Sequence, residues 1–291
     1  MRVLVTGAGG MVGSAVVQYC TGLGDEVFAH DHKSLDISRK EAVQEALEVA
    51  RPETVINCAA FTDVDKCEID RDRARMVNAL GPENLALCSR LVGASLVTIS
   101  TDYVFDGRKQ GFYTQRDDPN PQGVYASAKL EGERRAASAS ARTIIVRTGW
   151  IFGAGGKNFL ATVVHRALRG ERLRLIKDAW GTPTYARDLA ARLRELAARD
   201  LPGIFHVVNS GCGASFEEYA HVALAGLPHD PSQLESVEMS SLQRLAPRPV
   251  NSRLSCLLSE AIGLEPLPPW QEALKDFVRR TLNERGGISM L

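Results

Sequence analysis

The N-terminal segment constrains the fold more strongly than any other part of the chain. Residues 2–6 form a short β-rich run, the segment Gly7-Ala8-Gly9-Gly10-Met11-Val12-Gly13 follows, and an apolar helical pattern covers 14–23. A strand, a glycine turn and a helix in this order are typical of a dinucleotide-binding unit. The glycines let the backbone approach a pyrophosphate, and the helix N-terminus offers it free N–H groups. The segment predicts an α/β fold with a doubly wound, Rossmann-type parallel sheet.

The spacing within the glycine turn is T-G-x-x-G-x-x-G, starting at Thr6. It differs from the strict G-x-G-x-x-G pattern, because a valine stands where the third glycine is expected. A flexible surface loop is the alternative, but the strand before the turn and the helix after it favour a binding turn. The candidate cofactor-binding residues here are Gly7, Gly10, Met11, Val12 and Gly13.

The second predicted strand covers 26–30 and leads into Asp31. A carboxylate at this position accepts hydrogen bonds from the adenosine ribose and favours NAD, whereas His32 and Lys33 would attract the 2′-phosphate of NADP. Both NADH and NADPH therefore stay open as cofactors. Asp36 and Ile37 are further cofactor candidates on the adenine side, with a simple turn role as the alternative for Asp36.

Two further predicted strands end in residues suited to a binding crevice. The apolar run 54–57 is followed by Cys58-Ala59-Ala60, small residues that let a cofactor lie across the backbone. The β-rich run 95–100 leads into Thr101, and carboxyl ends of parallel strands meet at one edge of a sheet. The Thr101 hydroxyl is therefore a candidate to hydrogen-bond a substrate carbonyl oxygen.

The helical stretch 124–135 carries Tyr125 and Lys129, four residues apart and therefore on one face. An ammonium near a phenol favours the phenolate, so we expect Lys129 to lower the pKa of Tyr125 and make it a better proton donor. A solvated lysine beside a half-buried tyrosine is the alternative for the pair alone. With the glycine turn and the strand ends, Thr101, Tyr125 and Lys129 are predicted to be catalytic residues that reduce a carbonyl group with a nicotinamide cofactor.

The second half of the chain has a looser pattern. With 291 residues, the chain fits either one large α/β unit or two lobes. The apolar run 204–208 is expected to rejoin the main sheet. The irregular segment 246–253 carries two arginines, which suits an anionic ligand, with a merely solvated loop as the alternative.

Charge and cysteine use disfavour several classes of function. The chain has 291 residues with 35 basic and 35 acidic ones, so nothing favours nucleic acid or an anionic membrane as a partner. No apolar run reaches transmembrane length. The six cysteines are scattered without a C-x-x-C pair, which predicts reduced thiols in a cytoplasmic protein and no metal site.

Taken together, the motifs resemble the extended branch of the short-chain dehydrogenase/reductase superfamily. The matching residues are Thr6-Gly7-x-x-Gly10-x-x-Gly13, Thr101 and Tyr125-x-x-x-Lys129. Longer segments resemble the dTDP-4-dehydrorhamnose reductases more narrowly. These segments are Val55–Glu68, Ile99–Gly107, Gly181–Leu189 and Arg248–Leu254. The resemblance covers nearly the whole chain, from Met1 to about Trp270.

The resemblance implies a nucleotide-binding domain over 1–149 and a smaller lobe over 150–291 that binds the dTDP-sugar. It also implies reduction of the 4-keto group of dTDP-4-dehydro-L-rhamnose to dTDP-L-rhamnose, with NADPH or NADH. Tyr125 would protonate the developing alkoxide, Lys129 would hold the nicotinamide ribose, and Thr101 would position the carbonyl. The residues implied at the substrate are Thr101, Tyr103, Tyr125 and Trp150, with Arg248, Asn251 and Ser252 near the diphosphate.

Three departures from the family pattern stand out. Gly149 replaces a usual serine, which removes a hydroxyl near the sugar, and Pro247 replaces a usual arginine. Ser14-Ala15 occupies the region where some members carry a magnesium-binding glutamate. We therefore expect no metal-bridged dimer, and a monomer or homodimer as the assembly.

Two alternative functions stay open. A nucleotide-sugar epimerase or dehydratase of the same superfamily is the alternative enzyme. A dehydratase needs a second carboxylate after the strand-end threonine, and this chain has Asp102-Tyr103 there, which argues against dehydration and less strongly against epimerisation. A non-catalytic NADP-binding regulatory subunit, like that of methionine adenosyltransferase, is the alternative of a different class.

Overall fold

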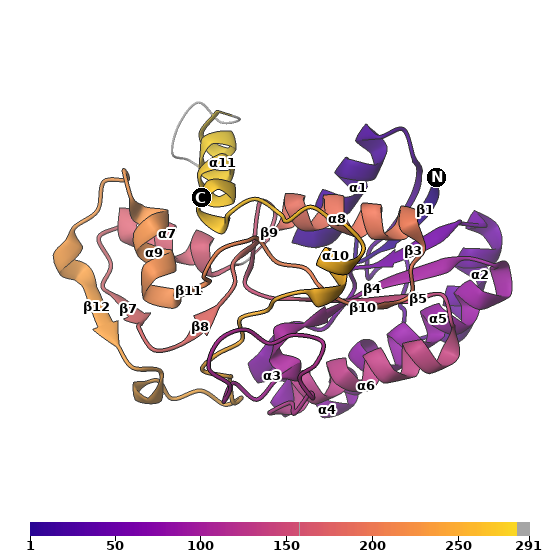
Figure 1. The fold of residues 1–291 in the computed structure, drawn as a ribbon, viewed down its shortest axis with the longest axis horizontal. Helices are drawn as coiled ribbons and strands as arrows, with labels where there is room; N and C mark the ends of the chain where they lie inside the picture. The colour runs from indigo at the N-terminus through magenta and orange to yellow at the C-terminus, as the bar shows by residue number, and fades with distance from the viewer. Residues whose placement is uncertain (157, 284–291) are drawn as a thin grey trace.

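A six-stranded parallel sheet forms the centre of the protein in this computed structural model, which describes residues 1–156 and 158–283 (Figure 1). The strands lie in the order β10-β5-β4-β3-β1-β2. Their bounds are β1 (Arg2–Thr6), β2 (Glu26–His30), β3 (Thr54–Asn57), β4 (Ser95–Thr101), β5 (Thr143–Thr148) and β10 (Gly203–His206). The order changes direction at β1, between β2 and β3. This confirms the predicted doubly wound α/β fold.

The carboxyl ends of the strands meet along one edge because the sheet is parallel. Thr6 of β1 lies opposite Asn57 of β3, and Thr101 of β4 lies opposite Thr148 of β5. Buried hydrogen bonds cross the sheet here: the Thr6 hydroxyl donates to Asn57 Oδ1 at 2.6 Å, and Asn57 Nδ2 donates to the Thr98 hydroxyl at 3.0 Å. The segments that leave the strands are thus held close together at the edge where open α/β sheets bind ligands.

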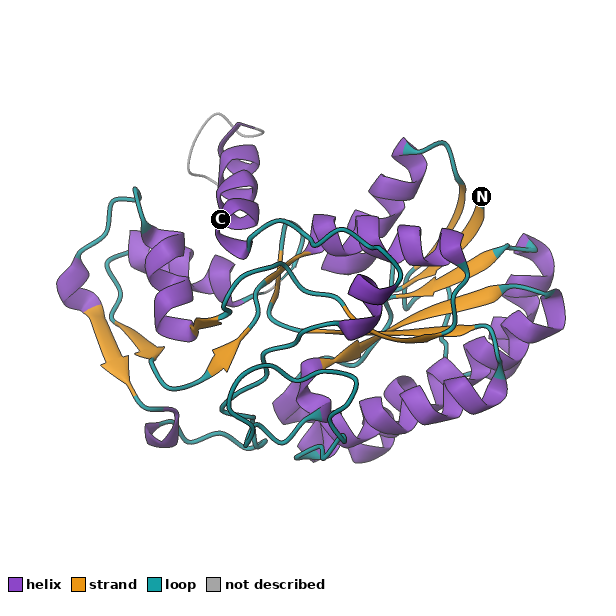
Figure 2. Cartoon of the chain, in the orientation of Figure 1, coloured by secondary structure: helices purple, strands orange, loops and turns teal. Residues whose placement is uncertain are grey.

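Helices cover both faces of the sheet (Figure 2). One face carries α1 (Met11–Gly22) and α8 (Ala186–Arg199), and the other carries α2 (Lys40–Ala50), α5 (Gly81–Val92) and α6 (Val124–Ala139). Side chains alternate along β1, so that Val3 and Val5 join the core under α1 and α8, whereas Leu4 joins the core under α2 and α5. Burial on both faces explains why the strands are almost continuously apolar.

Short elements connect the strands at the binding edge. They are α3 (Val64–Ile69), α4 (Arg71–Arg75), a π-helical turn (Met76–Leu80) and a 3₁₀ turn after β4 (Asp102–Val104). Asn78 in the π-helical turn is buried and binds the loop after β3 with both side-chain amide atoms. Its Oδ1 accepts from the Phe61 N–H at 2.8 Å, and its Nδ2 donates to the Phe61 carbonyl at 2.9 Å. This contact fixes the backbone that carries Cys58-Ala59-Ala60.

A smaller lobe with a separate aromatic core lies beside the binding edge (Figure 1). Its elements are β6 (Ile151–Phe152), α7 (Phe159–Leu168), β7 (Leu173–Ile176), β8 (Trp180–Gly181), β9 (Thr184–Tyr185), β11 (Ala214–Ser215), α9 (Phe216–Leu224), 3₁₀ turns at Pro231–Gln233 and Met239–Ser241, β12 (Leu234–Val237) and α11 (Trp270–Asn283). Phe152, Tyr219 and Trp270 are buried in its core. Stacked and edge-on rings fill this core, as in the Phe152–Tyr185 pair with ring centroids 5.3 Å apart.

The chain returns to the sheet between two parts of this lobe. After β9, α8 packs beside α1, and β10 then pairs with β5. The strand expected over 204–208 thus lies at 203–206, at the edge of the main sheet. The short helix α10 (Leu257–Ala261) also packs near β10. Among the described residues, no helix has the length and apolar character needed to cross a membrane.

Candidate active site

The glycine turn between β1 and α1 leaves no room for side chains. Gly7 has a φ of 68°, and a Cβ there would lie 2.6 Å from the Ala59 backbone nitrogen. A Cβ on Gly13 would lie 2.1 Å from the Gly7 carbonyl oxygen. Gly10 caps α1 without a side-chain hydrogen bond, so side chains leave the N–H groups of the first turn free. The turn therefore fits the backbone approach of a dinucleotide pyrophosphate.

A cleft of about 610 Å³ opens between this turn, the binding edge and the smaller lobe. It brings together many of the predicted site residues. These are Gly10, Met11, Val12, Gly13, Cys58, Ala59, Ala60, Thr101, Tyr103, Tyr125, Lys129 and Trp150. The structure therefore places the glycine turn, the Tyr–Lys helix and the strand-end threonine around a single cavity.

Thr101 and Tyr125 meet at the floor of the cleft. Thr101 is 5% exposed at the end of β4, where its hydroxyl donates to Asp102 Oδ1 at 3.1 Å and accepts from the Tyr103 N–H at 3.2 Å. Tyr125 lies in the first turn of α6, with its ring edge-on to Tyr103 at 6.3 Å. Burial raises the pKa of Tyr125 well above its usual value. Hydrogen bonding with the Thr101 hydroxyl lowers this pKa, but by less. The phenol is therefore fully protonated at neutral pH.

Lys129 behaves differently from the sequence prediction. Its ammonium donates to the Ile99 carbonyl of β4 at 2.6 Å, and burial lowers its pKa to about 8 despite the opposing charge of Glu133. Burial raises the pKa of Tyr125, and the largest effect in the opposite direction comes from the Thr101 hydroxyl. The predicted lowering of the Tyr125 pKa is thus wrong. The physical reason is that burial outweighs any charge effect on the phenol, and the ammonium is bound to a strand carbonyl.

The adenine-side candidates lie outside the cleft lining. Asp31 Oδ1 accepts the backbone N–H groups of Lys33 and Ser34, both at 2.9 Å, and these bonds lower its pKa. Asp36 is exposed and accepts the Ser38 N–H at 3.0 Å, which is a turn role. The Ile37 side chain is buried in the core under α2 and α5. Asp31 directly follows β2 and lies beside the glycine turn. A Cβ on Gly9 would lie 3.4 Å from the Asp31 Cβ.

The three predicted diphosphate residues also lie outside the cleft lining, and each has a protein partner. Arg248 donates to both carboxylate oxygens of Asp65. Asn251 Nδ2 donates to the carbonyls of Lys109 and Gly111, at 2.6 and 2.7 Å. The buried Ser252 hydroxyl donates to the Trp180 carbonyl at 3.5 Å, and its hydrogen bonding lowers the pKa of the nearby Asp102 carboxyl. Segment 246–253, which we call the strap, is therefore folded against both lobes and connects them.

Aromatic side chains of the smaller lobe line the same cleft as Thr101 and Tyr125. Trp150 has a φ of 50° and stacks on Phe216 with ring centroids 3.8 Å apart. Gly181 accommodates the indole, because a Cβ there would lie 2.1 Å from Trp150 ring atoms. Phe159 and Tyr219 also line the cleft. Sequence reasoning identified Trp150 but missed the other three rings, which carry no local motif and reach the cleft only through the packing of α7 and α9.

Two charged residues near the site were also missed. Asp102 lines the cleft with its carboxyl buried. Arg244 is exposed beside the strap, and within the described part of the chain no hydrogen bond or ion pair to it is found. Its charge interacts with Arg248, Tyr103 and Asp65, and partial desolvation together with Arg248 lowers its pKa. Its position four residues before Arg248 is the one sequence signal that points to it.

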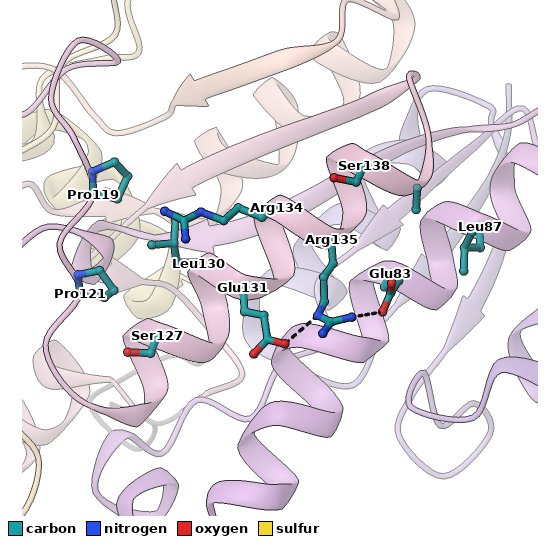
Figure 3. A pocket seen from close by; sticks show the side chains of 11 residues that line it. Glu83, Leu87, Pro119, Pro121, Ser127, Leu130, Glu131, Arg134, Arg135 and Ser138 are labelled. Atoms are coloured by element: carbon teal, nitrogen blue, oxygen red, sulfur yellow. Dashed lines mark hydrogen bonds and ion pairs between the residues drawn. The ribbon is translucent and has the colours of Figure 1, made fainter.

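A larger cavity elsewhere lacks such chemistry. It has a volume of about 740 Å³ and lies on α5 and α6 near Pro119 and Pro121 (Figure 3). Its charges compensate one another, since Arg135 pairs with Glu131 at 2.7 Å and with Glu83 at 2.9 Å. Across 1–156 and 158–283, no group of three or more His, Cys, Asp or Glu side chains could hold a metal ion. The cleft at the binding edge is the candidate active site.

The fold and the cleft define a Rossmann-type, NAD(P)H-dependent oxidoreductase. Residues 1–283 match the family model of the RmlD substrate binding domain, and the chain belongs to this family. The chain is 37% identical over 280 residues to a dTDP-4-dehydrorhamnose reductase from Mycolicibacterium smegmatis, which covers 95% of this chain and 85% of the relative.

Two solved structures agree with this assignment. A dTDP-4-dehydrorhamnose reductase from Clostridium acetobutylicum superimposes with a TM-score of 0.92 at 35% identity, covering 97% of this chain and 99% of the other. The Bacillus anthracis enzyme, in complex with NADP, has a TM-score of 0.92 at 33% identity, covering 96% and 99%. The predicted enzyme class and family are thereby confirmed.

Proposed function

We propose that this protein reduces the 4-keto group of dTDP-4-dehydro-L-rhamnose to give dTDP-L-rhamnose, using NADPH or NADH, in the biosynthesis of rhamnose. The observation that carries the proposal is the shared cleft of Thr101, Tyr125 and the glycine turn. The family relationship supports the choice of sugar. The cytoplasm is the proposed location, since this is where reduced cysteines persist and the six cysteines of this protein are free thiols.

The residues of the chain have distinct parts in this reaction. A bound nicotinamide cofactor would supply the hydride. Gly7, Gly10 and Gly13 would hold its pyrophosphate, and Lys129 would hold its nicotinamide ribose. Thr101 donates to the keto oxygen, and Tyr125 gives its proton to the oxygen as negative charge develops there. Burial keeps the Tyr125 phenol protonated until that point.

The sugar nucleotide spans both lobes in this proposal. Tyr103 and Trp150 line the cleft beside the catalytic pair and pack on the sugar ring. Arg248 and Arg244 lie on the strap side, where their positive charge suits the diphosphate. Asn251 builds this region by holding the 109–111 loop rather than by offering a free amide to the ligand.

The arrangement disfavours a dehydratase. Removal of water across C5 and C6 of the sugar needs a second carboxylate beside the first, and Tyr103 occupies the position after Asp102. An epimerase would consume no reductant overall, and a regulatory subunit would bind NADP without turnover. Both alternatives therefore predict no net loss of NADPH in the presence of the keto sugar.

A coupled assay tests the proposal. dTDP-4-dehydro-L-rhamnose is generated in place, and the absorbance of NADPH and of NADH is followed separately after the purified protein is added. We expect oxidation of the cofactor that depends on the sugar, with dTDP-L-rhamnose as the product. Cofactor binding without oxidation, on this sugar and on other dTDP-4-keto-6-deoxy sugars, contradicts the proposal. Conversion of the sugar without oxidation then favours an epimerase, and an unchanged sugar favours the regulatory alternative.

A further inference from the structure

The Asp102 carboxyl is an unusual neighbour for Thr101. It is 3% exposed, and its Oδ1 accepts the Thr101 hydroxyl proton at 3.1 Å. Its buried Oδ2 makes no hydrogen bond of ordinary geometry within the described structure, although the Ser252 hydroxyl acts on the carboxyl as a hydrogen-bond donor. Such an oxygen is costly to bury as a charged group. The carboxyl thus faces two hydroxyls, those of Thr101 and Ser252, and no ion pair to it is found among the described residues.

Gly149 provides the space for this carboxyl. A Cβ at position 149 would lie 2.3 Å from Asp102 Cγ, 2.4 Å from Oδ2 and 2.6 Å from Oδ1. These distances are far too short for non-bonded atoms, so a side chain at 149 would force the carboxyl to rotate. The glycine that replaces the usual serine thus makes the observed contact between Asp102 and Thr101 possible.

A hydroxyl has one proton to donate, and this limits what Thr101 can do. In the structure the proton goes to Asp102 Oδ1, while the Thr101 oxygen accepts from the Tyr103 N–H. A threonine in this state has no proton left for a keto oxygen. If the carboxyl carries a proton instead, the acid can donate to Thr101, and the threonine proton is released towards the cleft.

We propose that Asp102 is a positioning residue that sets the direction of the Thr101 hydroxyl. When Asp102 is a neutral acid, the Thr101 proton is free to bond the keto oxygen. When Asp102 is a carboxylate, it accepts this proton and withdraws it from the keto oxygen. The inference rests on the proposed function, because the keto oxygen is the acceptor. Asp102 itself need not touch the substrate. No carboxylate acts as a base in the reaction, and no atom is transferred to or from Asp102.

The surroundings of Asp102 agree with a change of protonation below neutral pH. Burial raises its pKa from 3.8 to about 6, against smaller effects of Ser252 and Thr101. The titratable groups that face it are the phenols of Tyr103 and of Tyr125, on α6. The pKa of each phenol is raised by burial, so both stay neutral over this range.

The neighbouring Tyr103 phenol interacts in turn with the charges of Arg248, Arg244 and Asp65. The catalytic lysine, with its pKa lowered to about 8, titrates at higher pH and gives a separate effect. A loss of activity above about pH 6 can therefore be assigned to Asp102, and one near pH 8 to Lys129.

The experiment measures kcat/KM from about pH 5 to about pH 9 in the wild type and in Asp102→Asn, with each enzyme saturated with NADPH. The asparagine is uncharged at every pH and can donate to Thr101 through its amide. We expect wild-type kcat/KM to fall on the order of tenfold between pH 6 and pH 7.5, and this fall to be absent in the variant. An unchanged fall in Asp102→Asn overturns the proposal.

Asp188 offers a matched control. Its carboxyl is half-buried with a raised pKa and accepts from Asn209 Nδ2 at 2.7 Å, but it does not line the cleft. Asp188→Asn should keep the wild-type pH profile. If Asp188→Asn also removes the fall near pH 6, the effect is not specific to Asp102 and the proposal is wrong.

A spectroscopic measurement separates this proposal from the proposed function. Infrared difference spectra of the NADPH complex between about pH 5 and about pH 8 should show a protonated carboxyl band that disappears with rising pH and is absent from Asp102→Asn. The band requires no sugar turnover. Its absence from the wild type overturns the inference, whereas a protein with the band but no ketone reduction contradicts only the proposed function.

Gly149→Ala is the second variant if Asp102→Asn does not fold. The added methyl group would displace the carboxyl from Thr101. We expect the fall in kcat/KM near pH 6 to shrink or move, and a profile identical to the wild type would contradict the proposed contact.

Discussion

The Arg248 guanidinium donates to both oxygens of the Asp65 carboxylate, with Nη1–Oδ1 at 3.0 Å and Nη2–Oδ2 at 2.8 Å. Asp65 Oδ1 also accepts the Ala246 N–H at 2.9 Å. These bonds hold the pKa of Asp65 down at about 2. The strap therefore closes onto α3 through a carboxylate, in the same forked geometry that an arginine uses with a phosphate.

This pairing gives a prediction for substrate affinity. Asp65→Asn removes the charge that competes with the ligand for Arg248. We therefore expect a KM for the sugar nucleotide that is about two- to fivefold lower, with kcat unchanged, because a partly exposed ion pair contributes a free energy of this size. Arg248→Ala should instead raise KM on the order of tenfold or more. Steady-state kinetics of both variants check this. If Asp65→Asn raises KM as Arg248→Ala does, the carboxylate serves to position the arginine.

Arg244 should contribute to the same step. It faces Tyr103 and Arg248, and no ion pair to it is found in the described structure, so its charge is available to an anionic ligand. We expect Arg244→Ala to raise KM roughly tenfold without changing kcat, and to weaken the dependence of KM on salt. Arg172→Ala, at an exposed arginine paired with Glu235 in the smaller lobe, is the control and should leave KM unaltered. Equal effects of both substitutions would contradict a local role for Arg244.

Tyr125→Phe tests the proton donor. The substitution removes the phenol hydroxyl and keeps the buried ring, so NADPH affinity should stay within about twofold while kcat falls on the order of 10²–10⁴-fold, the usual effect of a positioned acid. Cofactor affinity is measured by fluorescence titration, and kcat by the coupled assay. Tyr113→Phe is a useful comparison, because the Tyr113 hydroxyl donates to Asp106 in the first lobe. A Tyr125→Phe enzyme with nearly full activity would rule out the assignment.

Two glycines of α1 form a matched pair for the cofactor turn. Gly13→Ala places a methyl group 2.1 Å from the Gly7 carbonyl and must distort the turn, so we expect at least a tenfold loss of NADPH affinity. Gly22→Ala, at the other end of the same helix, meets nothing within 4 Å. It should keep cofactor affinity and raise the free energy of unfolding by up to about 1 kcal/mol. Calorimetric titration and urea unfolding measure the two effects.

Asp102 should also make stability depend on pH. Its pKa is raised on folding, so the folded state binds the proton more tightly than the unfolded chain. This stabilisation is present at low pH and is lost as the pH rises through about 6. Between about pH 5 and pH 8, the wild type should lose on the order of 1 kcal/mol relative to Asp102→Asn. Urea unfolding of both proteins at the two pH values tests this, and parallel changes would show that the Asp102 pKa is not raised.

Much of the fold was predictable because its signals are local. Apolar runs and glycine positions set the strands of the sheet, and 26–30 and 54–57 are observed with the predicted bounds. The glycine turn, Thr101 and Tyr125 were also identified from local patterns that the parallel sheet brings to one edge. Helix α1 begins at Met11, three residues before the predicted start at 14, because its first turn is built from the glycine segment itself.

The remaining features depend on contacts between distant segments. The bond of Lys129 to the Ile99 carbonyl and the pairing of Arg248 with Asp65 join residues 30 and 183 positions apart. Phe216 reaches the cleft through the packing of α9 in the smaller lobe. No pattern in the neighbouring sequence reports such contacts, since they arise only when the lobes are assembled.

The return of α8 and β10 to the central sheet has a consequence for engineering. The smaller lobe is not a contiguous piece of chain, because its first part precedes α8 and its second part follows β10. Exchanging the smaller lobe between relatives therefore requires two grafts, one on each side of 186–206. A single crossover after β5 would give one parent's first five strands and the other parent's edge strand, and so would create a new seam between β5 and β10 inside the nucleotide-binding core.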